Sequence, residues 1–180
     1  MRRVFLAMAV CCLVAGPALA DGGVDLFGTY GEVIEGENSG GVGIRVSLGG
    51  TNLLFDFTAT WYKEINDIAV IDDPAVADDD FQIFPLDFGV RYLFSDGKKV
   101  RPYLGGGVSY VVADANRLAV DDGFGMYAIG GLRVGRQQGI NFMVELVYRW
   151  AEVTVEYGQG LDDDVTLGGF GASAGIALIF

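Results

Sequence analysis

The sequence predicts an all-β protein, an eight-stranded antiparallel up-and-down transmembrane β-barrel. Three observations lead to this fold class. Apolar and polar residues alternate over stretches of about ten residues, and a period of two is typical of strands whose two faces meet different surroundings. No long helical period follows Ala20. Large apolar side chains gather on one face of each stretch, and small or charged ones gather on the other.

The first twenty residues have the features of an export signal. Arg2 and Arg3 precede an apolar run over 4–15, and the run is followed by the small-residue pattern Ala18-Leu19-Ala20. This order of a basic, an apolar and a small-residue region predicts a signal peptide over 1–20 that is cleaved after Ala20. The apolar run is shorter than the ~20 residues that a helix needs to cross a bilayer.

The remaining domain, 21–180, excludes several classes of function by its composition. It keeps 10 basic and 24 acidic residues, a net charge of −14, which argues against nucleic acid as a partner. Both cysteines, Cys11 and Cys12, lie in the signal peptide, so the domain folds without disulfides. Histidine is absent, so Ser109 and Ser173 have no imidazole base for nucleophilic catalysis. We therefore expect no enzyme and no cofactor.

Eight segments carry the alternation, most clearly those over 84–94 and 140–151. The phase of the first segment, Val24 to Val33, is ambiguous from the sequence. The other expected strands cover 42–48, 53–61, 104–112, 126–134 and 170–180.

The connections between these segments differ in length and charge. Short ones cover 49–50, 95–99 and 136–139, whereas long ones cover 34–41, 63–80, 113–123 and 152–164. In an up-and-down barrel the two sets leave from opposite ends. Together with Glu32 just before the first of them, the long connections carry 18 of the 24 acidic residues, so the molecule is expected to be electrically polarised from end to end. The conformation of 63–80 is left open.

The strand faces indicate which side meets lipid. Eight strands enclose room for little more than side chains, so small residues suit the inside and bulky apolar residues suit an outside in contact with acyl chains. The expected interior also holds charges that form ion pairs, with Asp87, Arg91, Glu145 and Arg149 as members, unless some of these residues lie at the solvated rims. The charged positions on the expected inward faces are Arg45, Asp56, Asp87, Arg91, Arg133, Glu145 and Arg149. A soluble, lipocalin-like periplasmic barrel with its apolar faces inward, binding a small apolar ligand, is the alternative.

Aromatic residues are expected to form two belts, as in membrane barrels. Four lie at strand ends that lead into long connections: Trp61, Tyr110, Tyr148 and Trp150. Three lie at the opposite rim: Tyr92, Phe94 and Phe180.

The segment from Arg101 to Tyr110 (RPYLGGGVSY) and a last strand that ends in Phe180 resemble small outer-membrane barrels of the OmpA/OmpX-like class. The resemblance covers the whole mature chain. It implies a bacterial outer-membrane location, short turns in the periplasm and long loops outside the cell. It also implies that the barrel-assembly machinery recognises the last strand, where Ile176 and Phe180 fit the family pattern and Leu178 stands at a position that is often aromatic.

The expected role is structural or adhesin-like, exerted through acidic extracellular loops that contact a ligand. Outer-membrane lipid is the expected partner, and the barrel is expected to be a monomer. Carboxylate oxygens suit Ca²⁺ or Mg²⁺, so weak divalent-cation binding at the loops is a further hypothesis. Its candidate ligands are Asp78, Asp79, Asp80, Asp162, Asp163 and Asp164.

Overall fold

The computed structural model describes residues 22–34, 37–63, 81–94, 98–115, 119–120, 122–157 and 161–180. The expected signal peptide and nearly all of the connection over 63–80 lie outside these ranges. The described residues form nine strands: β1 (Gly23–Ile34), β2 (Glu37–Gly49), β3 (Leu53–Tyr62), β4 (Phe81–Leu93), β5 (Val100–Ala115), β6 (Ala119–Val120), β7 (Gly123–Gly135), β8 (Gly139–Tyr157) and β9 (Leu161–Ile179).

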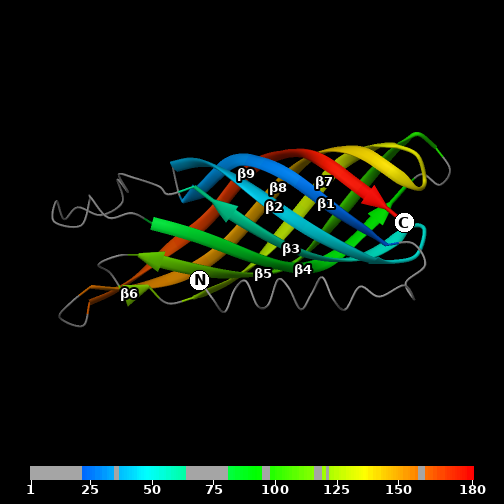
Figure 1. Cartoon of the computed structure of the whole chain (residues 1–180). Coiled ribbons are helices and arrows are strands. Elements are labelled where there is room, and N and C mark those ends of the chain that lie inside the picture. The colour runs from blue at the N-terminus through cyan, green and yellow to red at the C-terminus, as the bar shows by residue number, and fades with distance from the viewer. Residues whose placement is uncertain are drawn as a thin grey trace.

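Eight of these strands close into a barrel, which confirms the predicted fold class. Each strand pairs antiparallel with its neighbours in the order β8, β7, β5, β4, β3, β2, β1, β9, and β9 also pairs with β8. The closing strand therefore pairs on both sides, with Gly23 of β1 and Gly139 of β8 both opposite Ile179. The long, tilted strands run the length of the cylinder, with the short turns and the C-terminus at one end (Figure 1).

Three connections that the sequence predicts to be long are largely strand. β2 begins at Glu37, directly opposite Ile34, so little of the predicted loop over 34–41 remains. β8 and β9 continue as a hairpin to the pair Tyr157 and Leu161. β6 adds a short third strand to this hairpin by pairing with Val155 and Glu156 of β8 (Figure 1). The β-branched run Val153-Thr154-Val155 has high strand propensity, which explains why pairing continues past the predicted strand end.

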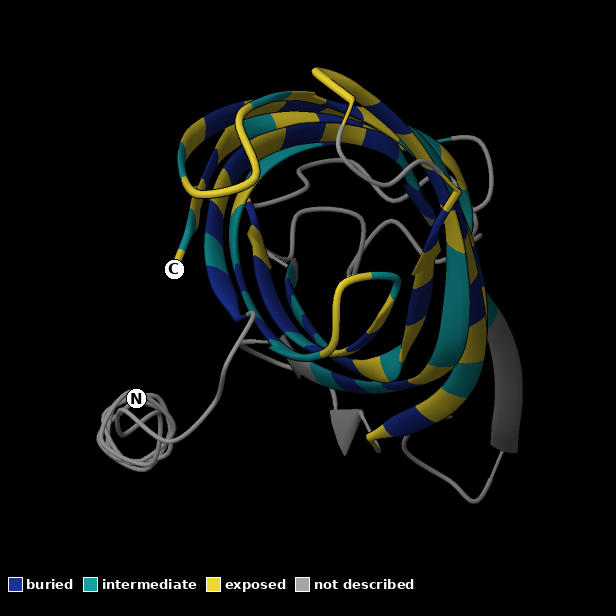
Figure 2. Cartoon of the chain, turned by 90° about the vertical axis from the view of Figure 1, so that its right-hand side faces the viewer, coloured by how far each residue is buried: buried dark blue, intermediate teal, exposed yellow. Residues whose placement is uncertain are grey.

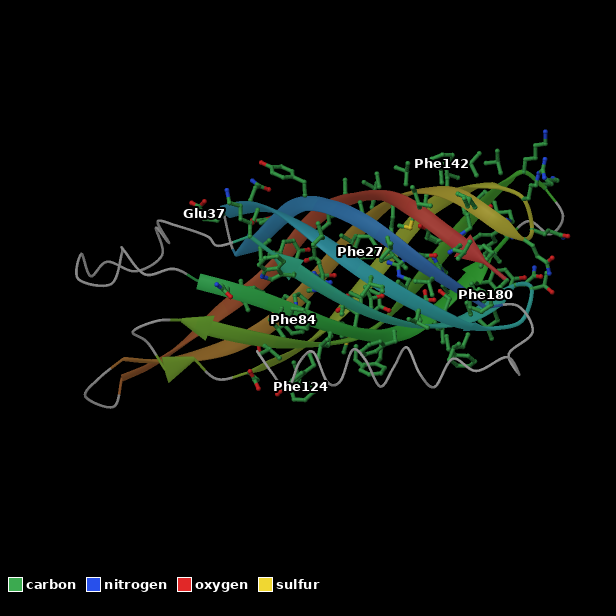
Figure 3. All side chains as sticks on the ribbon, viewed as in Figure 1. Phe27, Glu37, Phe84, Phe124, Phe142 and Phe180 are labelled. Carbon is green, nitrogen blue, oxygen red and sulfur yellow. The ribbon has the colours of Figure 1, made fainter. Side chains whose placement is uncertain are left out.

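Side chains alternate between the two surfaces of the barrel wall. Along β8, Phe142, Val144 and Leu146 are exposed, with 60–66% of their area accessible. Asn141 and Met143, between them in sequence, are buried. Figure 2, which looks along the barrel from the short-turn end, shows the same alternation of exposed and buried residues around the ring. In Figure 3, Phe142 and Phe124 point away from the cylinder.

The outer surface is consequently an apolar band. Among the described residues, 27 large apolar side chains are exposed. Soluble monomers rarely present contiguous apolar patches beyond a few hundred Å². The soluble alternative with inward apolar faces therefore does not match the structure, because the strand faces have the opposite orientation.

Aromatic side chains sit at both ends of this band. Toward the long connections, Tyr110 packs on Phe124 and Tyr148 on Phe170, with ring centroids 4.9 and 4.8 Å apart. At the short-turn end, Tyr92 meets Phe94 edge to face at 5.2 Å. Trp61 and Trp150 are exposed near the long connections, and Phe180 is exposed at the opposite rim.

Large side chains also cross the interior, where glycines make room for them. Leu54, Leu93, Tyr103, Tyr127 and Ile129 form a buried cluster within the lumen. A Cβ added at Gly131 would lie 2.6 Å from the Tyr103 ring and 2.5 Å from the Val144 carbonyl oxygen. Glycine at this position thus allows an aromatic residue to span a narrow barrel.

We predict that Gly131→Ala lowers the free energy of unfolding by about 1–3 kcal/mol, the usual cost of overpacking a filled interior. Gly50→Ala is the matched control, because no heavy atom lies within 4 Å of a Cβ built there. Urea unfolding of both variants in the same detergent measures the difference. Equal stability of the two variants would contradict the close packing around Tyr103.

Candidate functional site

The candidate site is the charged interior of the barrel. All seven charged residues predicted to face inward are buried, with at most 9% of their area exposed. The structure places them in two groups along the barrel. Five of them gather nearer the short turns, and Asp87 and Arg149 pair nearer the long connections.

Asp25 is the centre of the larger group, and the sequence did not identify it. One of its carboxylate oxygens, Oδ2, lies 2.9 Å from Arg133 Nη2, 3.2 Å from Arg91 Nη1 and 3.7 Å from Arg45 Nη1. Asp25 is fully buried, so these three guanidinium groups replace its water shell. The ambiguous phase of the first strand concealed this role. The exposed positions Leu26 and Tyr30 share a face of β1, and that pattern places Asp25 on the opposite, inward face.

Arg45 and Glu145 form a bidentate ion pair within the larger group. Arg45 donates from Nη1 and Nη2 to the two Glu145 oxygens at 2.9 and 2.7 Å, and from Nε to the Thr58 hydroxyl at 3.0 Å. The Tyr103 hydroxyl donates to Glu145 at 3.0 Å. This fork geometry is the strongest form of a guanidinium–carboxylate contact.

Arg91 joins Asp25 to a second carboxylate. Its Nε lies 3.0 Å from Asp56 Oδ2, and its Nη2 donates to Asp56 Oδ1 at 3.2 Å and to the Ser47 hydroxyl at 2.7 Å. The guanidinium carbon also lies 5.1 Å from the centre of the Tyr103 ring, a cation–π distance. Arg91 has no exposed surface. Its guanidinium group is instead surrounded by Asp25, Asp56, the Ser47 hydroxyl and the Tyr103 ring.

The smaller group binds Arg149 to Asp87. Arg149 Nη2 lies 2.6 Å from Asp87 Oδ2, and the Ser109 hydroxyl donates to Asp87 Oδ1 at 2.6 Å. Arg149 Nη1 donates to the Tyr62 hydroxyl at 3.3 Å. The Ser109 hydroxyl therefore contributes a hydrogen bond to the carboxylate of this buried ion pair.

The interior ion pairs link the strands of the barrel to one another. Buried charges are stable only when each has a partner, and removing one partner costs roughly 3–5 kcal/mol. Leu54, Leu93, Tyr127 and Ile129 fill part of the lumen beside the larger group. The ion pairs connect strands that are distant around the ring, such as β2 with β8 and β1 with β7.

The side chains of the two candidate cation-binding runs lie outside the described part of the chain. Asp78, Asp79 and Asp80 lie outside the described residues. The backbone of Asp162, Asp163 and Asp164 belongs to β9, opposite Glu156, Val155 and Thr154, while their side chains lie outside the described part of the chain. The described residues contain no cluster of three or more potential metal ligands. Divalent-cation binding therefore stays a prediction from the sequence.

The candidate assembly signal occupies the outward face of the last strand. Ile176, Leu178 and Phe180 are each about half exposed, at 48–50%. The Phe180 amide donates to the Gly22 carbonyl oxygen at 3.1 Å, which ties the C-terminal residue to the chain just before β1. Recognition by an assembly machinery stays a prediction.

Within the described residues, no helix is both long and apolar enough to cross a membrane.

We predict that Asp25→Asn lowers the free energy of unfolding by about 3–5 kcal/mol, because three buried guanidinium groups lose their shared countercharge. Glu152→Gln, an exposed carboxylate on β8, is the matched control and should change stability by less than about 0.5 kcal/mol. Urea unfolding followed by tryptophan fluorescence compares them. If both variants unfold at the same urea concentration, Asp25 does not hold the interior together.

Comparison with known proteins identifies the fold. No family model matches the chain. No curated protein matches it either. Solved structures do match: OprG of Pseudomonas aeruginosa has a TM-score of 0.63 at 12% identity, covering 90% of this chain and 96% of that one. Neisserial surface protein A matches with a TM-score of 0.64 at 17% sequence identity, and the match covers 89% of this chain and 96% of that one.

A third match is Ail, the attachment invasion locus protein of Yersinia pestis, with a TM-score of 0.51 at 12% identity, covering 89% of this chain and 99% of that one. By name, OprG is an outer membrane protein and the Neisserial protein is a surface protein. At these identities the likeness concerns the fold. The chain has the closed eight-stranded fold of small outer-membrane barrels, as its resemblance to the OmpA/OmpX-like class implies.

Proposed function

We propose that the chain is an integral protein of the bacterial outer membrane with a structural and surface-contact role, and that it catalyses no reaction. The observation that carries this proposal is the polarity of the barrel wall. A band of exposed apolar side chains surrounds a buried, ion-paired interior. Such a wall is suited to a lipid bilayer, because the backbone N–H and C=O groups are paired within the barrel and the charged side chains lie away from the acyl chains.

The membrane topology follows from the two ends of the barrel. The short turns carry exposed cations, namely Lys98, Lys99 and Arg136. The long connections carry most of the acidic residues of the sequence. We place the short turns in the periplasm, the long connections outside the cell and the cleavage of the signal peptide after Ala20.

A surface-contact role is supported by the end of the molecule that carries the long connections. There β8 and β9 continue as a hairpin to Tyr157 and Leu161, and β6 widens this hairpin to three strands. The backbone of this extended sheet continues past the pairs that close the ring and offers a surface to a partner. Ail, which has a similar fold, is named for attachment and invasion.

The lack of catalysis and conduction is part of the same proposal. The sequence contains no histidine, and the hydroxyls of Ser109 and Ser173 donate to Asp87 and Thr29. A nucleophilic serine needs a base within hydrogen-bonding reach, and neither has one of the usual type. The buried cluster around Tyr103 and Tyr127 narrows the lumen, which argues against a conducting pore.

Expression with its first twenty residues in a Gram-negative host tests this proposal. We expect the protein in the outer-membrane fraction, extractable only by detergent, with different mobility in SDS before and after boiling. Protease added to intact cells should cut only the long connections. Permeabilised cells serve as the control, because the short turns then become accessible.

A second arm of this experiment addresses surface contact. Cells that carry the intact chain should adhere to a host-cell layer more strongly than cells whose chain lacks residues 153–165. Both chains should remain in the membrane fraction, since this deletion spares the barrel ring. Recovery in the periplasmic extract would refute the membrane assignment, and equal adhesion would refute the contact role alone.

A further inference from the structure

The exposed cations of the barrel gather at one place on its rim. The structure describes nine Lys and Arg residues, and five of them are buried inside the ring. Of the four exposed ones, Lys63 follows β3 at the end with the long connections. The other three lie on two short turns at the opposite end, and we refer to them as the turn patch: Lys98, Lys99 and Arg136.

The two turns that carry the turn patch are neighbours in space. One turn joins β4 to β5 and the other joins β7 to β8, and β5 pairs directly with β7, where Val100 lies opposite Val134. The Gly135 amide donates to the Lys99 carbonyl oxygen at 2.8 Å, which ties the two turns together. Arg136 also lines the cavity inside the ring at this end, so the turn patch extends across the rim.

The side chains of the turn patch are free to bind a ligand. No ion pair to a described residue involves any of the three, and the C-terminal carboxylate at the same end pairs with none of them. Asp96, in the first turn, lies outside the described residues. Counted in full against the turn patch, it leaves two positive charges.

An apolar surface begins directly beside these cations. Val100 follows Lys99 and is 46% exposed, and its partner Val134 is 43% exposed. Ile140, near the start of β8, is 66% exposed. A lipid whose phosphate is bound at the turn patch would therefore have its acyl chains beside an apolar wall. A water-soluble phosphate would make only the first of these two contacts.

We propose that the turn patch binds the headgroup of an anionic phospholipid in the leaflet at the short-turn end. A guanidinium group binds phosphate in fork geometry, and an ammonium group binds it as a point charge. Each Lys or Arg near an anionic membrane surface strengthens attraction about fivefold. The domain has a net charge of −14, which disfavours anionic lipid, so the preference comes from the local cations. The inference rests on the membrane location proposed above.

The proposed lipid site occupies one sector of the rim. The turn between β2 and β3, over 50–52, contains no charged residue. β3 and β4 separate β2 from β5 around the ring. The wall above the uncharged turn therefore provides an internal reference within the same molecule.

Quenching by brominated lipid tests the site in chains with a single tryptophan. Trp61 and Trp150 are replaced by Phe, and one indole is introduced either by Val100→Trp, beside the turn patch, or by Leu48→Trp, on the outward face of β2. Each chain is placed in phosphatidylcholine bilayers that contain brominated phosphatidylglycerol or brominated phosphatidylcholine. We expect the anionic lipid to be preferred about fivefold or more in Val100→Trp and to show little preference in Leu48→Trp.

Lysine substitutions identify the charges responsible. In the Val100→Trp chain, Lys98→Gln combined with Lys99→Gln should bring the ratio of the two affinities close to one. Lys63→Gln is the control, because it removes an exposed cation at the other end and should leave the ratio unchanged. All of these positions are on the surface, and a change of mobility in SDS on boiling verifies that each variant is folded.

Three results would overturn the proposal. The first is an equal preference at both tryptophans, which would indicate no local site. The second is a preference that survives the loss of both lysines. The third is loss of the preference on addition of excess glycerol phosphate, which would assign the turn patch to soluble phosphates. Absence of quenching by either lipid at both positions would instead refute the membrane location itself.

Discussion

Pairing of β9 with both β1 and β8 closes the sheet, and the rest of the structure depends on this closure. A closed sheet leaves no row of unpaired N–H and C=O groups, which in hydrocarbon would cost several kcal/mol each. Eight strands close around a narrow lumen, so inward side chains from separate strands meet there, as Arg45 of β2 and Glu145 of β8 do. The outward side chains have no protein neighbour above them, and the structure fills these positions with large apolar groups.

The narrow lumen explains both the ion pairs and their arrangement. With little room for water, an inward carboxylate is stable only beside a cation, and Asp25 serves three arginines at once. The same crowding requires glycine where an aromatic residue spans the interior. Gly131, for example, leaves the space that the Tyr103 ring occupies. Toward the short turns the lumen widens into a cavity whose lining includes Leu54, Leu93 and Arg133.

Much of this organisation could be predicted from the sequence, because alternation of period two determines the strand faces directly. The inward positions of Arg91 and Glu145 followed from apolar residues on either side of them. Asp25 was missed because small and apolar residues are mixed in the first segment and its phase was left open. The partners of each charge also could not be predicted, since Arg45 and Glu145 are 100 residues apart and their contact depends on barrel register. The continuation of β8 and β9 to Tyr157 and Leu161 was missed, because the acidic and glycine residues over 152–164 indicated a loop.

The outward orientation of the apolar faces is the central claim, and quenching by brominated acyl chains tests it most directly. Replacing Trp61 and Trp150 by Phe leaves a chain to which one tryptophan can be added. In Leu146→Trp the indole would occupy the middle of the exposed face of β8, and we predict strong quenching in bilayers of brominated lipid. In Arg136→Trp it would occupy a short turn and should be quenched weakly. Equal weak quenching in both variants would contradict the account.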